Sequence, residues 1–180
     1  MIVFPYFVEY HFYVENHQGV SKVVPTDAQF NLDLQAIGRA LSPRTRVVLI
    51  NSPNNPSGVV YSAATIQALS ALLRQKQAEF GTQIYLVSDE PYKKLLDDGM
   101  AYPEVYPYYA KSLVVTSHTK DLALPGERIG YIATNPACAD VDELQDGLSF
   151  ANRTLVAIPV GYLMVSYGQK CFPHRSLTDA

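Results

Sequence analysis

Short apolar runs of strand length alternate with segments of helical periodicity along this chain. Runs rich in β-branched residues occupy Arg46–Asn51, Ile84–Glu90, Lys111–Ser117 and Arg128–Ala133. Continuous apolar runs of this length are typical of parallel strands that are buried on both faces. Between the first two lies Ser62–Phe80, in which apolar residues recur at helical spacing. The alternation predicts a three-layer α-β-α fold with a mostly parallel sheet.

Capping residues and shorter patterns complete the predicted element list. Ser62 is the expected N-cap of the long helix and Gly81 its stop. Asn31 is the expected cap of a helix that continues to Leu41. The remaining expectations are an apolar element at Met1–Phe4 ended by Pro5, a segment over Phe7–Glu15 whose mixed pattern fits a helix or a strand and favours the helix, a short strand over Val20–Val24, and helices over Asp140–Phe150 and Asn152–Tyr167.

Composition narrows the functional classes. The 180 residues are 48% hydrophobic and 17% charged, which predicts one globular domain. A net charge of -3 with scattered lysines and arginines gives no basic stripe, so nucleic acid is not an expected partner. No apolar run approaches the roughly 18 residues that a membrane helix needs. The first residues lack the features of a signal peptide, and the two cysteines show no CxxC spacing, so we expect a cytoplasmic protein.

Three polar segments follow predicted strands. They are Asn51–Gly58 (NSPNNPSG), Asp89–Tyr92 (DEPY) and Ser117–Lys120 (SHTK). Each residue in them, taken singly, is an ordinary turn, capping or surface residue. In parallel sheets, however, ligands bind in the crevice at the carboxyl ends of the strands. The three segments are therefore expected to meet at one ligand site.

Together and in this order, the three segments resemble the class I/II aminotransferases, the pyridoxal-phosphate enzymes of fold type I. The resemblance covers most of residues 1–154 and is strongest to the branch with bacterial aspartate and aromatic aminotransferases. Its most specific part is Ser117, Thr119 and Lys120 followed by Gly126, Arg128 and Gly130 in TSHTKDLALPGERIGYIA. The resemblance implies a cofactor, pyridoxal 5'-phosphate, and no metal. It also implies a homodimeric parent family that acts on an amino acid and a 2-oxo acid.

The resemblance implies a role for each motif residue. Lys120 would form the Schiff base with the cofactor aldehyde, and its freed amine would then act as the general base. Asp89 would hold the pyridine nitrogen protonated, and Tyr92 and Asn55 would hydrogen-bond the phenolic oxygen. Arg128, Ser117 and Thr119 would bind the phosphate. Phe7 fits either the aromatic residue that stacks on the cofactor ring or a packing residue, with Tyr6 as a further candidate.

Not every polar residue near the motifs receives a role. His118 flanks the lysine, but no metal ligand or nucleophile is predicted beside it. It is interpreted as structural or solvated.

Family members are about twice as long as this chain, so the sequence is expected to be an incomplete member. We expect residues 1–154 to form part of the cofactor-binding large domain, residues 155–180 to form a divergent C-terminal helix or tail, and the small domain to be absent. The predicted function is pyridoxal-phosphate-dependent amino transfer through Lys120. Two alternatives stay open: a non-catalytic remnant, and a pyridoxal-phosphate lyase or synthase of the same fold.

Overall fold

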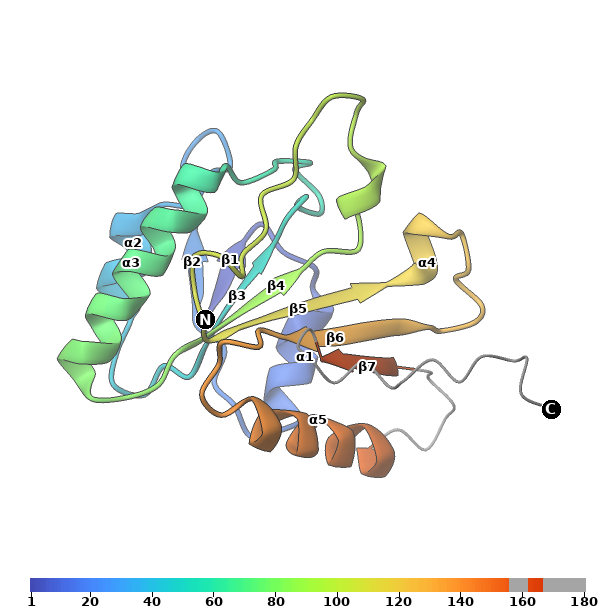
Figure 1. Cartoon of the computed structure of the whole chain (residues 1–180). Helices are drawn as coiled ribbons and strands as arrows, with labels where there is room; N and C mark the ends of the chain where they lie inside the picture. The colour runs from blue at the N-terminus through green and yellow to red at the C-terminus, as the bar shows by residue number, and fades with distance from the viewer. Residues whose placement is uncertain (156–161, 167–180) are drawn as a thin grey trace.

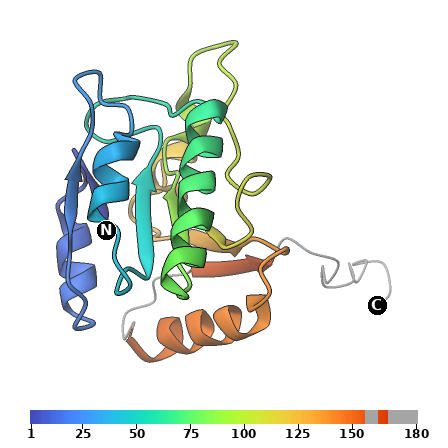
Figure 2. The same ribbon diagram turned by 90° about the vertical axis from the view of Figure 1, so that its left-hand side faces the viewer.

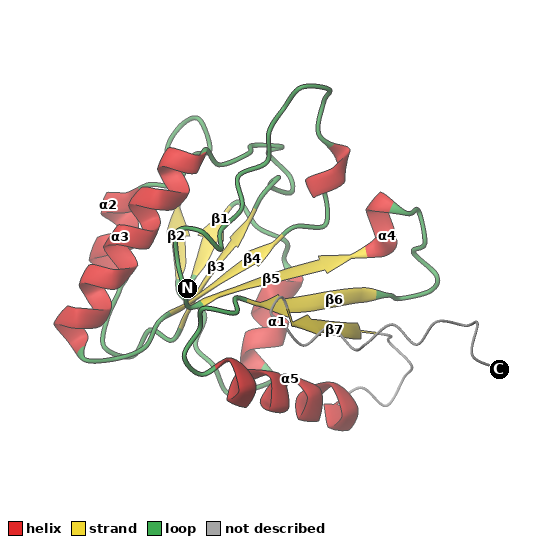
Figure 3. Cartoon of the chain, in the orientation of Figure 1, coloured by secondary structure: helices red, strands yellow, loops and turns green. Residues whose placement is uncertain are grey.

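A computed structural model describes residues 1–155 and 162–166 of the chain (Figure 1). The strands are β1 (Ile2–Phe4), β2 (Val23–Pro25), β3 (Val47–Asn51), β4 (Tyr85–Asp89), β5 (Ser112–Ser117), β6 (Gly130–Thr134) and β7 (Tyr162–Ser166). The helices are α1 (Glu9–Glu15), α2 (Leu34–Ala40), α3 (Ala63–Phe80), the 3-10 turn η1 (Lys93–Leu95), α4 (His118–Asp121) and α5 (Val141–Leu155). Figure 3 shows the helices red against the yellow strands.

The described strands form a single sheet in the order β2-β1-β3-β4-β5-β6-β7. All neighbouring pairs are parallel except β5 and β6, which run antiparallel with Ser117 opposite Gly130. The prediction of an α/β fold with a mostly parallel sheet is confirmed. The predicted strands at β3, β4, β5 and β6 all form.

The strands are added to the sheet in opposite directions from β1 and from β3. From β1 the chain crosses through α1 to β2 on one side, whereas from β3 it crosses through α3 to β4 on the other. Right-handed crossovers in opposite directions place their helices on opposite faces of a sheet. Figure 2 accordingly shows α1 and α3 on opposite sides of the sheet. The reversal makes the carboxyl ends of β1 and β3 a topological switch point, where sheets of this kind bind ligands.

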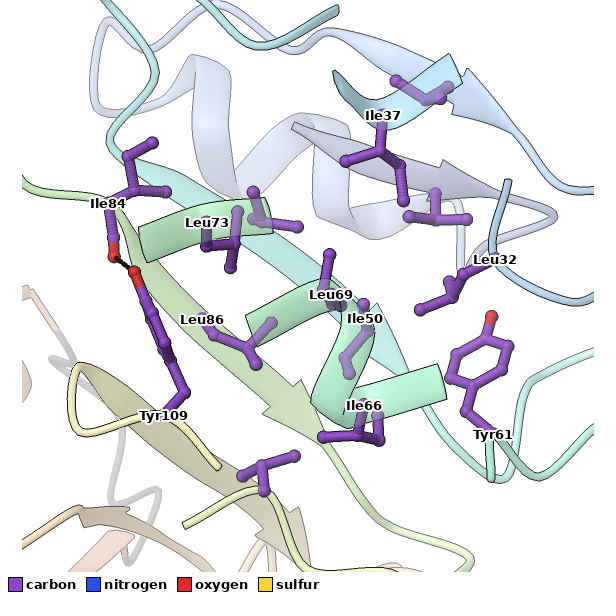
Figure 4. Close-up of a cluster of buried hydrophobic side chains, with 14 of the residues drawn as sticks. Leu32, Ile37, Ile50, Tyr61, Ile66, Leu69, Leu73, Ile84, Leu86 and Tyr109 are labelled. Atoms are coloured by element: carbon purple, nitrogen blue, oxygen red, sulfur yellow. Dashed lines mark hydrogen bonds between the residues drawn. The ribbon is translucent and has the colours of Figure 1, made fainter. Parts of the chain in front are cut away.

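An apolar core cluster lies between the sheet and helices α2 and α3 (Figure 4). Ile37, Leu69 and Leu73 from these helices are completely buried. They meet strand residues such as Ile50 and Leu86, which are at most 1% exposed. Burial of each such side chain stabilises the fold by roughly 1.5–3 kcal/mol before entropy costs. This cluster holds β3 and β4 rigidly against α3.

Helix ends follow the predicted capping chemistry in one case and depart from it in another. Ser62 Oγ accepts a hydrogen bond of 3.1 Å from Thr65 N, and Gly81 ends α3 with a left-handed φ of 63°. Both predictions for this helix are confirmed. The cap of α2 is Asp33, not Asn31, because the Asp33 carboxylate accepts a hydrogen bond of 2.8 Å from Ala36 N.

The C-terminal expectations are partly wrong. A single helix, α5, runs over Val141–Leu155, and Tyr162–Ser166 forms strand β7 instead of the predicted helix over Asn152–Tyr167. Parallel pairing with β6 supplies partners on one side of this edge strand, and tertiary pairing of this kind overrides local propensity. The rest of that prediction falls on positions 156–161 and 167, outside the described residues. The predicted strand at Val20–Val24 is also shifted, since β2 covers Val23–Pro25.

Candidate active site

The site begins with two neighbouring residues at the carboxyl ends of β3 and β4. The register of these strands places Asn51 opposite Asp89. Asn51 is 4% exposed, and its Nδ2 donates to the backbone oxygen of Asp89 at 3.0 Å and to the carboxylate Oδ2 at 3.5 Å. The amide therefore orients the Asp89 side chain.

Tyr10 is the second residue that holds this carboxylate. It lies on α1 behind the sheet, is buried, and its hydroxyl donates to Asp89 Oδ2. Burial, the Asp89 charge and hydrogen bond, and nearby Tyr92 all raise the pKa of Tyr10, which keeps the phenol protonated as the donor. Burial raises the pKa of Asp89 to about 6, although the hydrogen bond from Tyr10 favours the charged form. A cation placed against Asp89 would stabilise its charged form.

A hydrogen bond connects the loop after β3 to the loop after β1 across the switch point. Asn54 is buried, and its Nδ2 donates to the backbone oxygen of Pro5 at 3.0 Å. The backbone N–H of Asn55 donates to Asn51 Oδ1 at 2.7 Å. One asparagine at the end of β3 thus orients both Asp89 and the backbone of Asn55.

Asn55 and Tyr92 line the same open pocket of about 420 Å³. Its other walls are the loop after β3 and the segment that follows Tyr92, including Leu95, Leu96 and Met100. Ligand sites commonly have volumes of roughly 300–1,000 Å³, apolar walls and a few polar groups. The volume of this pocket falls within that range, and its lining includes Asn55 and Tyr92 but not Asp89.

Lys120 does not line this pocket but lies near one of its residues, Tyr92, at the neighbouring strand end. The sequence suggested a loop, but the residue lies on α4, a single helical turn that directly follows β5. The side chain is exposed, and its Nζ lies 5.9 Å from the centre of the Tyr92 ring. Figure 3 shows α4 and the short helix η1 beyond the ends of β5 and β4, and the two elements are in contact. The structure therefore brings Lys120 to Tyr92.

The residues predicted to bind phosphate lie near Lys120, at the end of β5, on α4 and before the start of β6, but their side chains are not joined to one another. Ser117 ends β5 and Thr119 lies on α4, both half-buried. Arg128 lies in the exposed segment before β6 with a φ of 53°, and its guanidinium reaches the backbone oxygen of Pro125 at 3.5 Å. No hydrogen bond among the described residues joins these three side chains.

Two further predictions concern Phe7 and His118. Phe7 is 38% exposed, and its ring meets the ring of Tyr10 edge-on at 5.8 Å. Phe7 thus contacts Tyr10, which in turn hydrogen-bonds Asp89. The Tyr6 hydroxyl hydrogen-bonds the His11 ring instead. His118 Nδ1 lies 3.2 Å from both carboxylate oxygens of Asp121.

The sequence reasoning missed Tyr10 and Asn51 as site residues. Asn51 had a detectable signal, since it is the last residue of a buried strand and precedes the polar loop. Tyr10 had none, because it is one of four aromatic residues between Phe7 and Tyr13. Within the described residues there is no cluster of metal-ligating side chains and no helix long and apolar enough to cross a membrane.

Comparison with known proteins gives consistent matches. The family described as "Aminotransferase class I and II" matches residues 1–159. A crystal structure of an aminotransferase from Eubacterium rectale is 42% identical with a TM-score of 0.83, covering 86% of this chain and 39% of that one. A probable aspartate/prephenate aminotransferase of Thermus aquaticus is 35% identical over 147 residues, which are 78% of this chain and 37% of the relative.

A more distant relative gives the same result. A probable aspartate aminotransferase of Methanocaldococcus jannaschii is 30% identical over 151 residues, or 84% of this chain and 37% of the relative. The chain therefore spans about two fifths of the length of the proteins it matches.

Proposed function

Since this chain belongs to the class I and II aminotransferase family, we propose that it contributes to pyridoxal-phosphate-dependent transfer of an amino group from an amino acid to a 2-oxo acid. The relatives named above are aminotransferases, which favours amino transfer over a lyase or synthase reaction. As in the parent family, we propose a cytoplasmic homodimer.

The environment of Asp89 carries this proposal. Tyr10 and Asn51 hold Oδ2, while Oδ1 accepts no hydrogen bond from any described residue. Burial leaves the charged carboxylate without a compensating cation, so a cationic group against Oδ1 would stabilise the charged form and be held by it. The protonated pyridine nitrogen of the cofactor is such a group. The residues present therefore fit pyridoxal phosphate.

The proposal also assigns a role to each of the other predicted residues. Tyr92 and Asn55, which share the pocket, would hydrogen-bond the phenolic oxygen. Arg128, Ser117 and Thr119 would bind the phosphate, for which the fork of a guanidinium is well suited. Phe7 would stack on the ring.

Lys120 would form the covalent bond to the cofactor and would transfer the proton during the reaction. When bound, the cofactor supplies an aldehyde that condenses with amines and a ring that accepts the electrons left at the substrate α-carbon. Lys120 would hold the cofactor covalently until an amino acid displaces it. The free Lys120 amine would then act as the general base that takes the α-proton and passes it to the cofactor carbon that carried the aldehyde. The Lys120 side chain is exposed, which leaves its amine accessible to both partners.

Absorbance spectroscopy tests the proposal. Adding pyridoxal phosphate to the full chain should produce a near-visible band, and the Lys120→Ala variant should lose it, because alanine has no amine to condense. Lys76→Ala, which removes a surface lysine of α3, is the matched control and should keep the band. An equal band in the Lys120→Ala variant would remove Lys120 from this role. Formation of a 2-oxo acid from aspartate then measures transfer itself.

A further inference from the structure

The short helix α4, which carries Lys120, has little to hold it in place by itself. It comprises four residues, and Ser117 at its N-cap makes no side-chain capping bond. Helices of this length are unstable in water without tertiary contacts. The Lys120 side chain makes no hydrogen bond or ion pair within the described part of the chain. The position of its amine therefore depends on what fixes α4.

Asp121, the last residue of α4, provides such a contact. Its side chain is 7% exposed, and its Oδ2 lies 3.0 Å from Nζ of Lys94 on η1. His118, one turn earlier on α4, lies 3.2 Å from the same carboxylate. Burial opposes the charge, but the hydrogen bonds from Lys94 and His118 hold the pKa of Asp121 below its usual value.

The ion pair and the active-site contact connect the same two elements. Tyr92 is the N-cap of η1 and Lys94 is its second residue, while Lys120 and Asp121 are adjacent on α4. Lys120 reaches Tyr92, and Asp121 reaches Lys94. A shift of α4 that broke the ion pair would also move Lys120 away from Tyr92.

The surroundings of the ion pair strengthen the connection. Lys94, Asp121 and Thr116 line a cavity of about 20 Å³ together with Glu90, which is 1% exposed. Thr116 Oγ1 donates to the backbone oxygen of Glu90 at 3.1 Å. This bond connects the end of β5, which leads directly into α4, to the residue that follows Asp89. The Asp121 carboxylate is thus enclosed, while the Lys94 side chain that pairs with it is 66% exposed, so removing Lys94 leaves a charged carboxylate without its cation.

We propose that Asp121 is a positioning residue for Lys120: with Lys94 and His118 it anchors α4 on η1 and keeps the Lys120 amine beside Tyr92. The proposal extends the function proposed above, because it assigns Lys120 the reactive amine. Asp121 contacts neither cofactor nor substrate in this role. Its effect passes through the backbone of α4.

Two single variants and their combination test the anchor in the full chain. Asp121→Asn keeps the shape of the side chain and removes its charge, and Lys94→Met keeps the exposed stem and removes the ammonium group. Lys76→Met, which breaks the surface pair with Glu79 on α3, is the control. Because Asp121 is buried, Lys94→Met keeps the test valid if Asp121→Asn fails to fold.

The first measurement needs no cofactor. Amide hydrogen exchange at His118, whose N–H donates to Ile129 O, and at Leu124, whose N–H donates to His118 O, should be about tenfold faster in both variants, with little change in α3. Exchange in the double variant should be no faster than in the faster single variant, because both single changes break the same ion pair. Unchanged exchange at α4, or fully additive effects, would refute the anchor.

The second measurement uses pyridoxal phosphate and separates positioning from general damage. Total cofactor bound, measured by dialysis, should stay within about twofold of the unmodified chain. The rate at which borohydride traps cofactor on Lys120 should fall about tenfold. Equal trapping rates would show that Asp121 does not position Lys120. If Lys120→Ala traps as much cofactor as the unmodified chain, the function proposed for Lys120 fails, while the exchange result still decides whether Asp121 anchors α4.

Discussion

The hydroxyl of Tyr10 donates a hydrogen bond to the carboxylate of Asp89, although 79 positions separate the two residues in the sequence. Tyr10 reaches the carboxylate from α1, on the face opposite α3, while Asn51 reaches it from the adjacent strand. Asp89 is thus held from two directions, and one oxygen remains available to a ligand.

Replacing Tyr10 with phenylalanine removes this donor. The hydrogen bond favours the charged form of Asp89, so its loss should raise the pKa of Asp89 above about 6. A hydrogen bond to a charged group contributes about 1.5–3 kcal/mol, which predicts at least tenfold weaker pyridoxal phosphate binding at neutral pH. Carboxyl NMR titration and equilibrium dialysis measure the two effects. Tyr13→Phe, on the same helix with Glu9 as its partner, is the control and should change neither.

Asp89 should also make the stability of the cofactor-free chain depend on pH. The folded chain keeps the Asp89 proton up to about pH 6, whereas the unfolded chain releases it near pH 3.8. Between these values the folded state binds more protons, so the contribution of Asp89 to stability falls as the pH rises. The shift corresponds to a loss on the order of 2 kcal/mol across this window.

Urea unfolding of the unmodified chain and Asp89→Asn at pH values across this window measures that contribution. The amide does not titrate, so the variant keeps the pH dependence of all other groups and should lose less stability than the unmodified chain. Identical pH slopes for the two proteins would contradict the raised pKa of Asp89.

The two motif glycines around Arg128 should differ sharply in their tolerance of alanine. A Cβ on Gly130 would lie 2.4 Å from the backbone oxygen of Thr116 on β5, whereas a Cβ on Gly126 would meet nothing within 4 Å. Gly130→Ala must push β6 away from β5 and should cost more than about 2 kcal/mol of stability. Gly126→Ala should change it by less than about 0.5 kcal/mol. Thermal unfolding of the two variants provides the comparison, and similar losses would show that the strands adjust freely.

The cap of α3 provides a test outside the site. Ser62→Ala removes the acceptor for Thr65 N and should lower the free energy of unfolding by about 1 kcal/mol. Ser62→Asp supplies another acceptor at the same position and should restore most of the loss. Denaturant unfolding measures both, and a loss that persists in Ser62→Asp would argue against capping as the cause.

The sequence by itself determined the features that depend on nearby residues. The ends of α3 follow from Ser62 and Gly81, whose bonds reach only three or four residues along the chain. The central strands follow from apolar runs that could be buried only inside a layered sheet. The polar segments that contain Asn55, Asp89, Tyr92 and Lys120 were recognised because they lie at the ends of such strands, and the resemblance to a known family singled out these residues within them.

Only the tertiary structure decided which distant residues act together. The pairing of Tyr10 with Asp89 arises because β1 and β3 lead in opposite directions, which sets α1 behind the strand that ends at Asp89. The contact between Lys94 and Asp121 arises because parallel β4 and β5 end side by side. Similarly, β7 forms where local reasoning predicted a helix, since its backbone bonds are supplied by β6. Hydrogen bonds and ion pairs act over a few ångströms in space, and a linear pattern does not specify which distant segments the folded sheet brings within that range.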